Sequence, residues 1–549
     1  MTKALLVPHT RIGVSPARRW FGGFCALTLL ALLCLVPTRS FCQAPAPMQA
    51  PAAASPVSDL LDVLLANGTI TQAQYDTLKE RFAAKHEAEM AKHEAQMAAQ
   101  PAQPAPMMVM PTNVVTAMDN GVGLNIGRYA LSFSGEINGF YVHDRSDRSS
   151  NNDGGCVLCL AVNGQLPNSS LRNGLLPGDL NIKISTKEAG WDVAVDFGIW
   201  PGIESLLTSP AGMNLAGGQP TGFGVEGVDF RQQYITFGRH GVGTFKVGRD
   251  LGFFGQEAIL NDMTIFGAGN TNGAGPGNAN PGAVTLGRIG IGYLYTDFMP
   301  QIGYTSPSMA GLQVSGAIFQ PLSDIVPTAL GLPQYSAPLT GHGQPQYQIK
   351  ATYAAPKIAG IKAKFWTNYL TQSMEADQSD INAECRGSLS PNCAPGDSRL
   401  LIPVGQSVRA NGVDYGVNAS FHGFDFVGYG YNGSGIGTEG LLFLATSRSG
   451  SKRDSQGYYL QGTYTVAKKW TLGASYGQSN LILADEELAK HEEYSPTLMK
   501  DNGSYVGQVR YGLTSWVNLV GEYTHSRSDS QRGLVSTDDS FALGSIAFF

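Results

Sequence analysis

The sequence predicts an all-β transmembrane barrel of sixteen antiparallel strands, preceded by a short α-helical or coiled-coil periplasmic module. Three observations predict this fold class. From Gly127 onward the chain divides into segments of about ten residues that alternate apolar and polar, the length and period of a tilted transmembrane strand. The connections between these segments alternate between short and long, and the chain ends on the aromatic residue Phe549.

The alternation gives each segment two different faces. Within 127–142, Tyr129, Leu131 and Phe133 share one face, and Ser132 and Ser134 share the other. Similar divisions recur within 180–185, 191–197, 361–365, 413–418 and 517–524. The apolar face would contact lipid and the polar face would line a lumen. A soluble β-sandwich would bury its apolar faces in a core, and the charges on the opposite faces argue against it.

The connections determine the strand count. Seven short turns occur at 187–190, 239–243, 307–311, 355–360, 422–423, 467–469 and 514–516. Eight long polar connections lie at about 143–177, 201–227, 250–298, 321–345, 373–410, 432–456, 480–502 and 528–537. Together they give sixteen strands, an even number, as antiparallel closure in bacterial barrels requires. We interpret the strand-like stretch 285–296 as the return of the third long connection into the sixth strand.

The C-terminal strand is predicted to close the barrel. The last residues read SFALGSIAFF, with no charge after Asp539. Pairing of the last strand with the first leaves no unpaired backbone edge in lipid, where each unpaired group is costly. Phe541 and Phe549 are therefore the candidate residues for barrel closure and assembly.

The N-terminal residues have the pattern of an export signal. Residues 1–20 carry four basic residues and no acidic one, and the apolar run 21–36 follows. This pattern predicts a signal peptide over 1–42, cleaved near 42–46. A single transmembrane anchor is the alternative, but the apolar run is short and a Pro/Ala-rich tract follows it.

The rest of the chain divides into four parts. Residues 43–57 form a Pro/Ala-rich linker, and 58–100 form a helical module that contains the heptads AKHEAEM and AKHEAQM, typical of a short coiled coil. A second linker covers 101–126, and the barrel covers 127–549. The helical module is expected to lie in the periplasm and to take part in oligomerisation.

Charge and cysteine content narrow the function. Removal of residues 1–42 leaves 32 basic and 43 acidic residues, a net charge of −11, which is unfavourable for nucleic-acid binding. Four cysteines remain in polar loops as two local pairs, Cys156 with Cys159 and Cys385 with Cys393. In an oxidising compartment this arrangement predicts two loop-closing disulfides. A zinc site or a redox CxxC at 156–159 would need a histidine ligand or a thioredoxin-like context, and neither is evident.

No part of the sequence has a catalytic pattern. His143, His240, His422 and His525 fall in turns or at strand ends without a clear catalytic partner. The glycine-rich stretch 267–282 lacks the lysine and the helix start of a phosphate-binding loop. We therefore expect neither enzyme activity nor a cofactor or metal.

The chain resembles the Gram-negative general porin family. The resemblance rests on FRQQYITFG at 230–238, GTFKVGR at 243–249, IGYTSP at 302–307, Ala310-Gly311 at a short turn and the C-terminal aromatic, and it covers 127–549. It implies a homotrimer in the cell outer membrane, in contact with lipid and lipopolysaccharide and inserted by the barrel-assembly machinery. The implied function is passive diffusion of ions and small hydrophilic solutes. The family prefers an aromatic two residues before the terminal phenylalanine, where this chain has Ala547.

The resemblance also implies a pore constriction, because the third long loop of these proteins folds into the barrel. Here that loop would run from Asp250 to about residue 283, with Asp250, Glu257 and Asp262 as its carboxylates. The bases expected to face them are Arg249, Lys183, Lys246, Lys350, Lys362, Lys364 and Arg510. Opposed charges in a narrow wet pore filter solutes by size, charge and dipole. Arg249 shares the outward parity of Val247, so its placement in the lumen would need a local bulge.

Two alternatives remain. A substrate-specific porin for sugars would show a row of lumenal aromatics, with Trp200, Trp366 and Tyr459 as candidates, and a phosphate porin would show a basic ladder at Lys350, Lys362 and Lys364. A structural or adhesive surface barrel would conduct poorly. The acidic net charge favours cations and the lysine cluster favours anions, so the sequence leaves ion selectivity open.

Overall fold

The structure is a computed structural model of the chain. It describes residues 75–77, 79–80, 115–118, 121–148, 168–203, 228–271, 284–322, 339, 341–376, 405–447, 449–490 and 498–549. The chain divides into two units, 1–108 and 109–549. In the first unit, 75–77 and 79–80 are helical. The predicted signal peptide, the linker 43–57, the rest of the helical module and the four loop cysteines lie outside the described residues. None of the helices in the described residues is long and apolar enough to cross a membrane.

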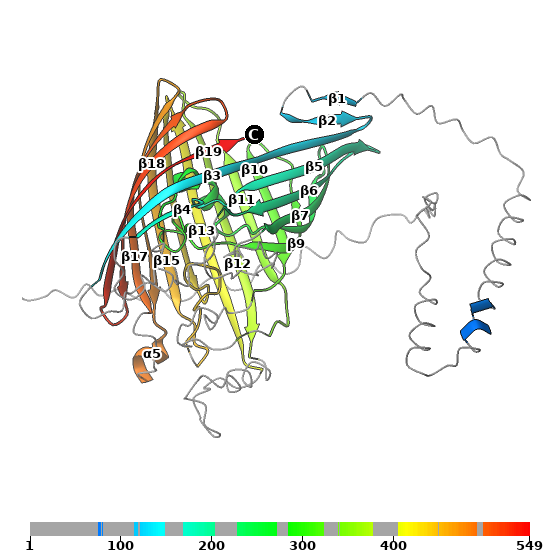
Figure 1. Cartoon of the computed structure of the whole chain (residues 1–549). Coiled ribbons are helices and arrows are strands. Elements are labelled where there is room, and N and C mark those ends of the chain that lie inside the picture. The colour runs from blue at the N-terminus through cyan, green and yellow to red at the C-terminus, as the bar shows by residue number, and fades with distance from the viewer. Residues whose placement is uncertain are drawn as a thin grey trace, which may run out of the picture. The chain divides into compact units, whose positions relative to one another are not determined.

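The second unit consists mainly of strands (Figure 1). In chain order they are β1 (Val115–Ala117), β2 (Val122–Ile126), β3 (Tyr129–Arg148), β4 (Asn168–Arg172), β5 (Asp179–Glu188), β6 (Trp191–Pro201), β7 (Val228–Arg239), β8 (Gly243–Leu251), β9 (Phe298–Thr305), β10 (Leu312–Phe319), β11 (Gln346–Ala354), β12 (Lys362–Glu375), β13 (Ser407–Phe421), β14 (Phe424–Ser434), β15 (Asp454–Val466), β16 (Trp470–Ile482), β17 (Met499–Gly512), β18 (Val517–Ser530) and β19 (Val535–Phe548). The described residues of this unit also form three short helices: α3 (Gln256–Asn261), the 3₁₀ helix η1 (Met263–Phe266) and α5 (Asp485–Lys490).

Sixteen strands form a closed antiparallel barrel, as the connection lengths predicted. Each strand from β5 to β19 pairs with the next, β4 and β5 both pair with β3, and β19 pairs with β3 to close the ring. Beyond β19, the backbone of Phe549 exchanges hydrogen bonds of 3.0 and 3.1 Å with that of Gly135. The stretch 101–126, expected as a linker, contains β1 and β2, and β2 pairs with the first residues of β3.

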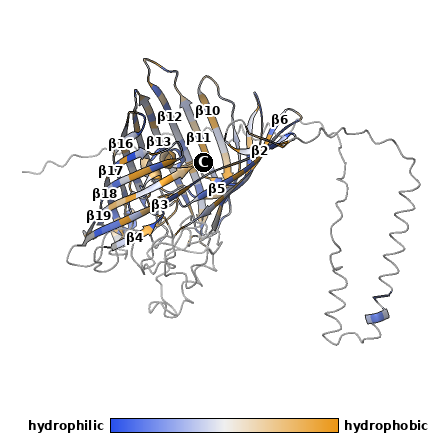
Figure 2. Cartoon of the chain, turned by 45° about the horizontal axis from the view of Figure 1, so that its top comes forward, coloured by the Kyte–Doolittle hydropathy of each residue, from blue (hydrophilic) through white to orange (hydrophobic). Residues whose placement is uncertain are grey.

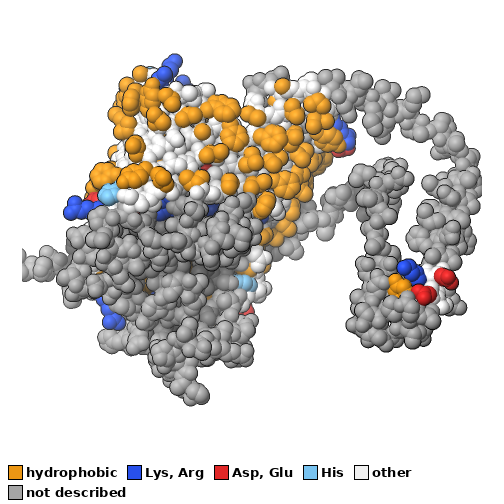
Figure 3. All heavy atoms as spheres, in the orientation of Figure 1, with side chains coloured by type: hydrophobic (Ala, Val, Ile, Leu, Met, Phe, Trp, Pro, Cys, Tyr) orange, Lys and Arg blue, Asp and Glu red, His pale blue; other side chains and the backbone are white. Residues whose placement is uncertain are grey.

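The wall has an apolar outer face and a polar inner face. Ile349 and Phe365 point outward and are exposed, whereas Gln348 and Asn368 on the same two strands point inward and are buried. Hydropathy therefore alternates along the strands (Figure 2), and apolar side chains gather on the outer surface of the barrel (Figure 3). This is the expected arrangement for strands that have lipid on one side and a lumen on the other.

The main apolar core lies where two connections meet the inner wall. Phe253, Phe254 and Leu294, between β8 and β9, belong to the same buried cluster as Leu442, between β14 and β15, and Trp366 of β12. Backbone hydrogen bonds join the two connections directly, because Tyr295 donates to Glu439 over 2.6 Å and accepts from Leu441 over 3.2 Å.

A buried ion pair holds the end of the barrel that carries the long connections. Arg453, just before β15, donates to the Glu487 carboxylate of α5 over 2.7 Å, and the two side chains are 0% and 1% exposed. Arg453 also donates to the Leu444 carbonyl, and Glu487 accepts from the backbone N–H of Ala484. The pair therefore ties the β14–β15 connection to the β16–β17 connection.

Loss of this pair should loosen the connections without unfolding the barrel. We expect Glu487→Ala to destabilise local packing by about 3–5 kcal/mol, because it leaves the Arg453 guanidinium buried without its counter-charge. Limited proteolysis of the folded protein should then cut within 435–453 or 483–490 faster than in the wild type. Asp485→Ala, at an exposed position of the same helix, is the matched control and should leave the rate unchanged. Equal cleavage of Glu487→Ala and wild type would contradict this role.

Candidate functional site

The described residues between β8 and β9, 252–271 and 284–297, form the β8–β9 segment. The segment begins with a turn at Gly255, whose φ of 78° lies in the left-handed region that favours glycine. A Cβ at this position would lie 2.8 Å from the Leu294 carbonyl oxygen. The turn directs the chain into α3 and then η1, which carry Glu257 and Phe266.

Side chains on the inner wall bind the backbone of this segment near α3. Gln348 of β11 accepts from the N–H groups of Phe253 and Phe254 over 2.7 and 2.8 Å. Asp414 of β13 accepts from the N–H of Gly255 over 2.6 Å. These contacts satisfy buried backbone donors that no strand partner reaches.

Further wall residues hold the chain beyond α3. Gln461 of β15 donates to the Asn261 carbonyl over 2.8 Å and accepts from the N–H of Met263 over 2.7 Å. Gln508 of β17 donates to the Met263 carbonyl over 3.0 Å. Glu522 of β18 accepts from the N–H groups of Ala268 and Gly269. Inward-facing side chains of β11, β13, β15, β17 and β18 therefore bind backbone groups of this segment.

Glu257 is the acidic centre of the site. Its carboxylate lies 2.6 Å from the Lys364 ammonium of β12 and 3.6 Å from the Lys350 ammonium of β11. The Lys350 ammonium also donates to the side chain of Gln256. Glu257 is 8% exposed and Lys364 is 43% exposed, so the ammonium, and not the carboxylate, meets the lumen.

Asp250 forms a second ion pair at the end of β8. Its carboxylate accepts from the ammonium of Lys246, four residues earlier on the same strand, and from the Gln232 amide of β7 over 2.9 Å. Lys246 also lies over the Tyr234 ring, 4.5 Å from the centroid. Again the lysine is more exposed than its acidic partner, 31% against 8%.

Asp262 caps a turn. Its carboxylate accepts from the N–H and hydroxyl of Thr264 over 3.0 and 2.6 Å and from the Tyr293 hydroxyl over 2.9 Å. Burial raises the pKa of this carboxyl, and the positive charge of Arg288 and these hydrogen bonds oppose that effect. Asp262 is 1% exposed, so its hydrogen bonds stabilise the interior of the β8–β9 segment.

The other predicted bases are placed differently. Arg510 of β17 stacks on Phe266 of η1, 3.9 Å from the ring centroid. Lys183 and Lys362 are exposed, opposite Asp196 and Ser420 in the strand register. The register of β8 with β7 and β9 is uninterrupted, so Arg249 keeps the outward parity of Val247 and the bulge required for a lumenal position is not present. Its role at the constriction stays a prediction.

The wall residues that bind the segment were not identified as site residues from the sequence. Their side chains occupy inward positions, where alternation already predicts polar residues, so no local pattern separates an anchor from a solvated side chain. The Asp262-Met263-Thr264 tripeptide is different, because an aspartate that bonds the backbone two residues on is a recognisable turn signal.

Comparison with known proteins agrees with the fold. A family model described as Gram-negative porin matches residues 131–531. The outer membrane channel DcaP of Acinetobacter baumannii is similar in structure, with a TM-score of 0.50 and 12% identity over 79% of this chain and 99% of that one. An anion-selective porin from Comamonas acidovorans has a TM-score of 0.45 and 12% identity, over 77% of this chain and 100% of that one. OmpF of Salmonella typhi, in complex with daunomycin, has a TM-score of 0.45 and 12% identity, over 77% of this chain and 98% of that one. The comparison with curated protein sequences gives no match.

The family model covers well over half of the chain, and it matches the closed sixteen-stranded barrel. The family and the fold point to a channel and not to an enzyme. The chain therefore belongs to the Gram-negative porin family, whose barrel forms a channel in the outer membrane for passive diffusion of small solutes.

Proposed function

We propose that the β8–β9 segment constricts the channel and that the constriction favours anions. The proposal is carried by one observation, the two lysines that share Glu257. Two ammonium groups on one carboxylate give these three side chains an excess positive charge. A charge of one sign in a narrow pore raises the local concentration of ions of the opposite sign.

Side-chain exposure also supports a preference for anions. The acids Glu257 and Asp250 are almost covered, whereas Lys364 and Lys246 reach solvent. A passing solute would therefore meet ammonium groups first. We infer that the acidic net charge of the whole chain has little influence on the pore, because screening weakens charges further than about 8–10 Å away at physiological ionic strength.

The sugar-specific alternative receives less support. Tyr459 and Trp366, candidates for a lumenal aromatic row, are 0% and 4% exposed and pack in the core with the β8–β9 segment. Trp200 packs against the same core. Of the basic ladder expected for phosphate, Lys350 and Lys364 converge on one carboxylate, and this favours a preference for anions as a class.

We also propose the finer features of the assembly. Residues 1–42 would be removed as a signal peptide, and 58–100 would form a periplasmic helical module. The two local cysteine pairs would form disulfides. The barrel would assemble as a homotrimer in contact with lipid and lipopolysaccharide, with Phe549 as part of the signal for the barrel-assembly machinery. The resemblance of the motifs to general porins supports the trimer, and the aromatic C-terminus supports the assembly signal.

The direct test is the reversal potential of the purified protein in a planar bilayer under a KCl gradient. The proposal predicts conductance steps in threes and a potential of the sign for chloride preference. A cation-selective potential would overturn the charge assignment, and a folded barrel without conductance would overturn the channel function.

Charge reversal at Lys364 should change this selectivity. We expect Lys364→Glu to lower the anion-to-cation permeability ratio by roughly tenfold, because it removes the most exposed charge of the cluster and adds its opposite. The reversal potential reports the ratio. Lys357→Glu makes the same charge change in the short turn between β11 and β12, where the side chain is exposed, and should leave the ratio near the wild-type value. Equal shifts in both variants would contradict a local filter.

Loss of a wall anchor should widen or loosen the constriction. Gln461→Ala removes hydrogen bonds to the Asn261 carbonyl and the Met263 N–H, and each buried group left unpaired costs about 1–3 kcal/mol. We expect larger single-channel conductance and more open-channel noise. Gln313→Ala is the control, because its amide bonds the Ser306 carbonyl at a short turn. An unchanged current trace for Gln461→Ala would show that this anchor does not hold the constriction.

A further inference from the structure

An apolar hollow of about 500 Å³ lies on the outer face of the barrel, over β14 to β18. Its floor consists of Gly462, Ala474 and Gly507, which face one another directly on the neighbouring strands β15, β16 and β17. A Cβ at Gly462 or Gly507 would meet no atom within 4 Å. Three small residues side by side on neighbouring strands therefore leave a gap in this part of the wall.

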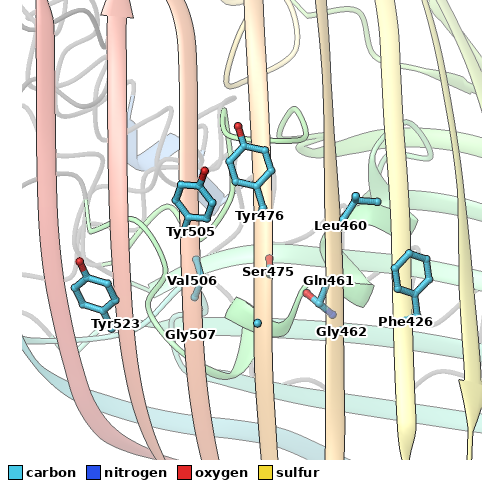
Figure 4. A pocket seen from close by; sticks show the side chains of 11 residues that line it. Phe426, Leu460, Gln461, Gly462, Ser475, Tyr476, Tyr505, Val506, Gly507 and Tyr523 are labelled. Atoms are coloured by element: carbon cyan, nitrogen blue, oxygen red, sulfur yellow. The ribbon is translucent and has the colours of Figure 1, made fainter.

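Large apolar side chains enclose the floor. Phe426 lies opposite Gly462 in the register, and Tyr523 lies opposite Gly507, so they form the two sides. Leu460, Tyr476 and Tyr505 form one end, and they face one another on β15, β16 and β17. Figure 4 shows these side chains around the hollow.

Three tyrosine hydroxyls are the polar groups of the outward-facing side chains around the hollow. The hydroxyls of Tyr476, Tyr505 and Tyr523 point in the same direction along the strands (Figure 4), toward the long connections. The Tyr476 hydroxyl donates to Gln478 over 3.2 Å, and the Tyr523 hydroxyl donates to Asp539 over 2.7 Å. A ligand that fits would be apolar along its length, with a polar group toward the long connections.

We propose that the hollow binds an acyl chain of a lipid in the outer leaflet. This proposal rests on the placement of the barrel in the outer membrane, where the long connections of porins are extracellular. The hollow is continuous with the apolar surface that contacts the membrane, so an acyl chain reaches it without crossing a polar barrier. The tyrosine hydroxyls would lie at the level of the headgroups, where amphipathic rings are favoured.

A lipid fits better than a second copy of the chain. The floor is backbone and a single methyl group, so a partner would have to fill the depth of the hollow with a side chain of its own. An acyl chain adapts its shape to such a gap and recovers the dispersion contacts that an empty space lacks. Docking of a second copy in the hollow is an alternative that the test distinguishes from lipid binding.

The test uses native mass spectrometry of the detergent-solubilised protein with added lipid A as the probe. We expect one retained lipid per chain, and about tenfold weaker retention in Gly507→Leu, the scale expected when a few methylene groups lose their burial. The φ of Gly507 lies outside the left-handed region, so leucine adds no backbone strain there. Gly462→Leu is the second variant and should act in the same way.

Gly316→Leu is the matched control. Gly316 faces outward on β10 with open space around it, but it has large neighbours, Tyr304 and Ile349, on both sides of the register. Retention equal to the wild type in this variant and weaker retention in Gly507→Leu would support the proposal. Equal retention in all variants would overturn it, as would loss of the oligomer in Gly507→Leu, which would assign the hollow to a second copy. Conductance measured on the same samples tests the channel function separately, because filling an outer hollow leaves the lumen unchanged.

Discussion

The pairing of β19 with β3 is the constraint on which the rest of the molecule depends. In a membrane every backbone N–H and C=O must find a partner within the protein, and a closed ring of strands achieves this without edges. Closure also gives each strand one face toward lipid and one toward the lumen. The outward faces must then be apolar, and the polar side chains that remain face the interior.

Those interior polar side chains have two roles. Gln348, Asp414, Gln461 and Glu522 bind backbone groups of the β8–β9 segment, which would otherwise be buried without partners. Lys350 and Lys364 instead pair with the single carboxylate of Glu257. The first group positions the segment and the second determines the charge next to it. Position and charge are thus separable, and substitutions in the two groups should affect conductance and selectivity respectively.

The fold could be predicted from the sequence because lipid on one side of the wall and water on the other make apolar and polar residues alternate along each strand. The alternation of short turns and long connections predicted sixteen strands, and the closed sixteen-stranded barrel confirms this number. The alternation of Val122, Leu124 and Ile126 was a signal for β2 within a stretch expected as a linker. The anchors could not be predicted, since inward polar residues look alike until the residues that contact them are known. The burial of Tyr459 and Trp366 could not be predicted either, because their apolar partners are far away in the chain.

A cryo-electron microscopy map of the protein in lipid nanodiscs would show directly whether the β8–β9 segment lies inside the barrel. We expect density for α3 inside the barrel, with Glu257 between Lys350 and Lys364 and the backbone of 253–269 against the inner faces of β11, β13, β15, β17 and β18. A lumen without this density, or a segment ordered outside the barrel, would contradict this expectation.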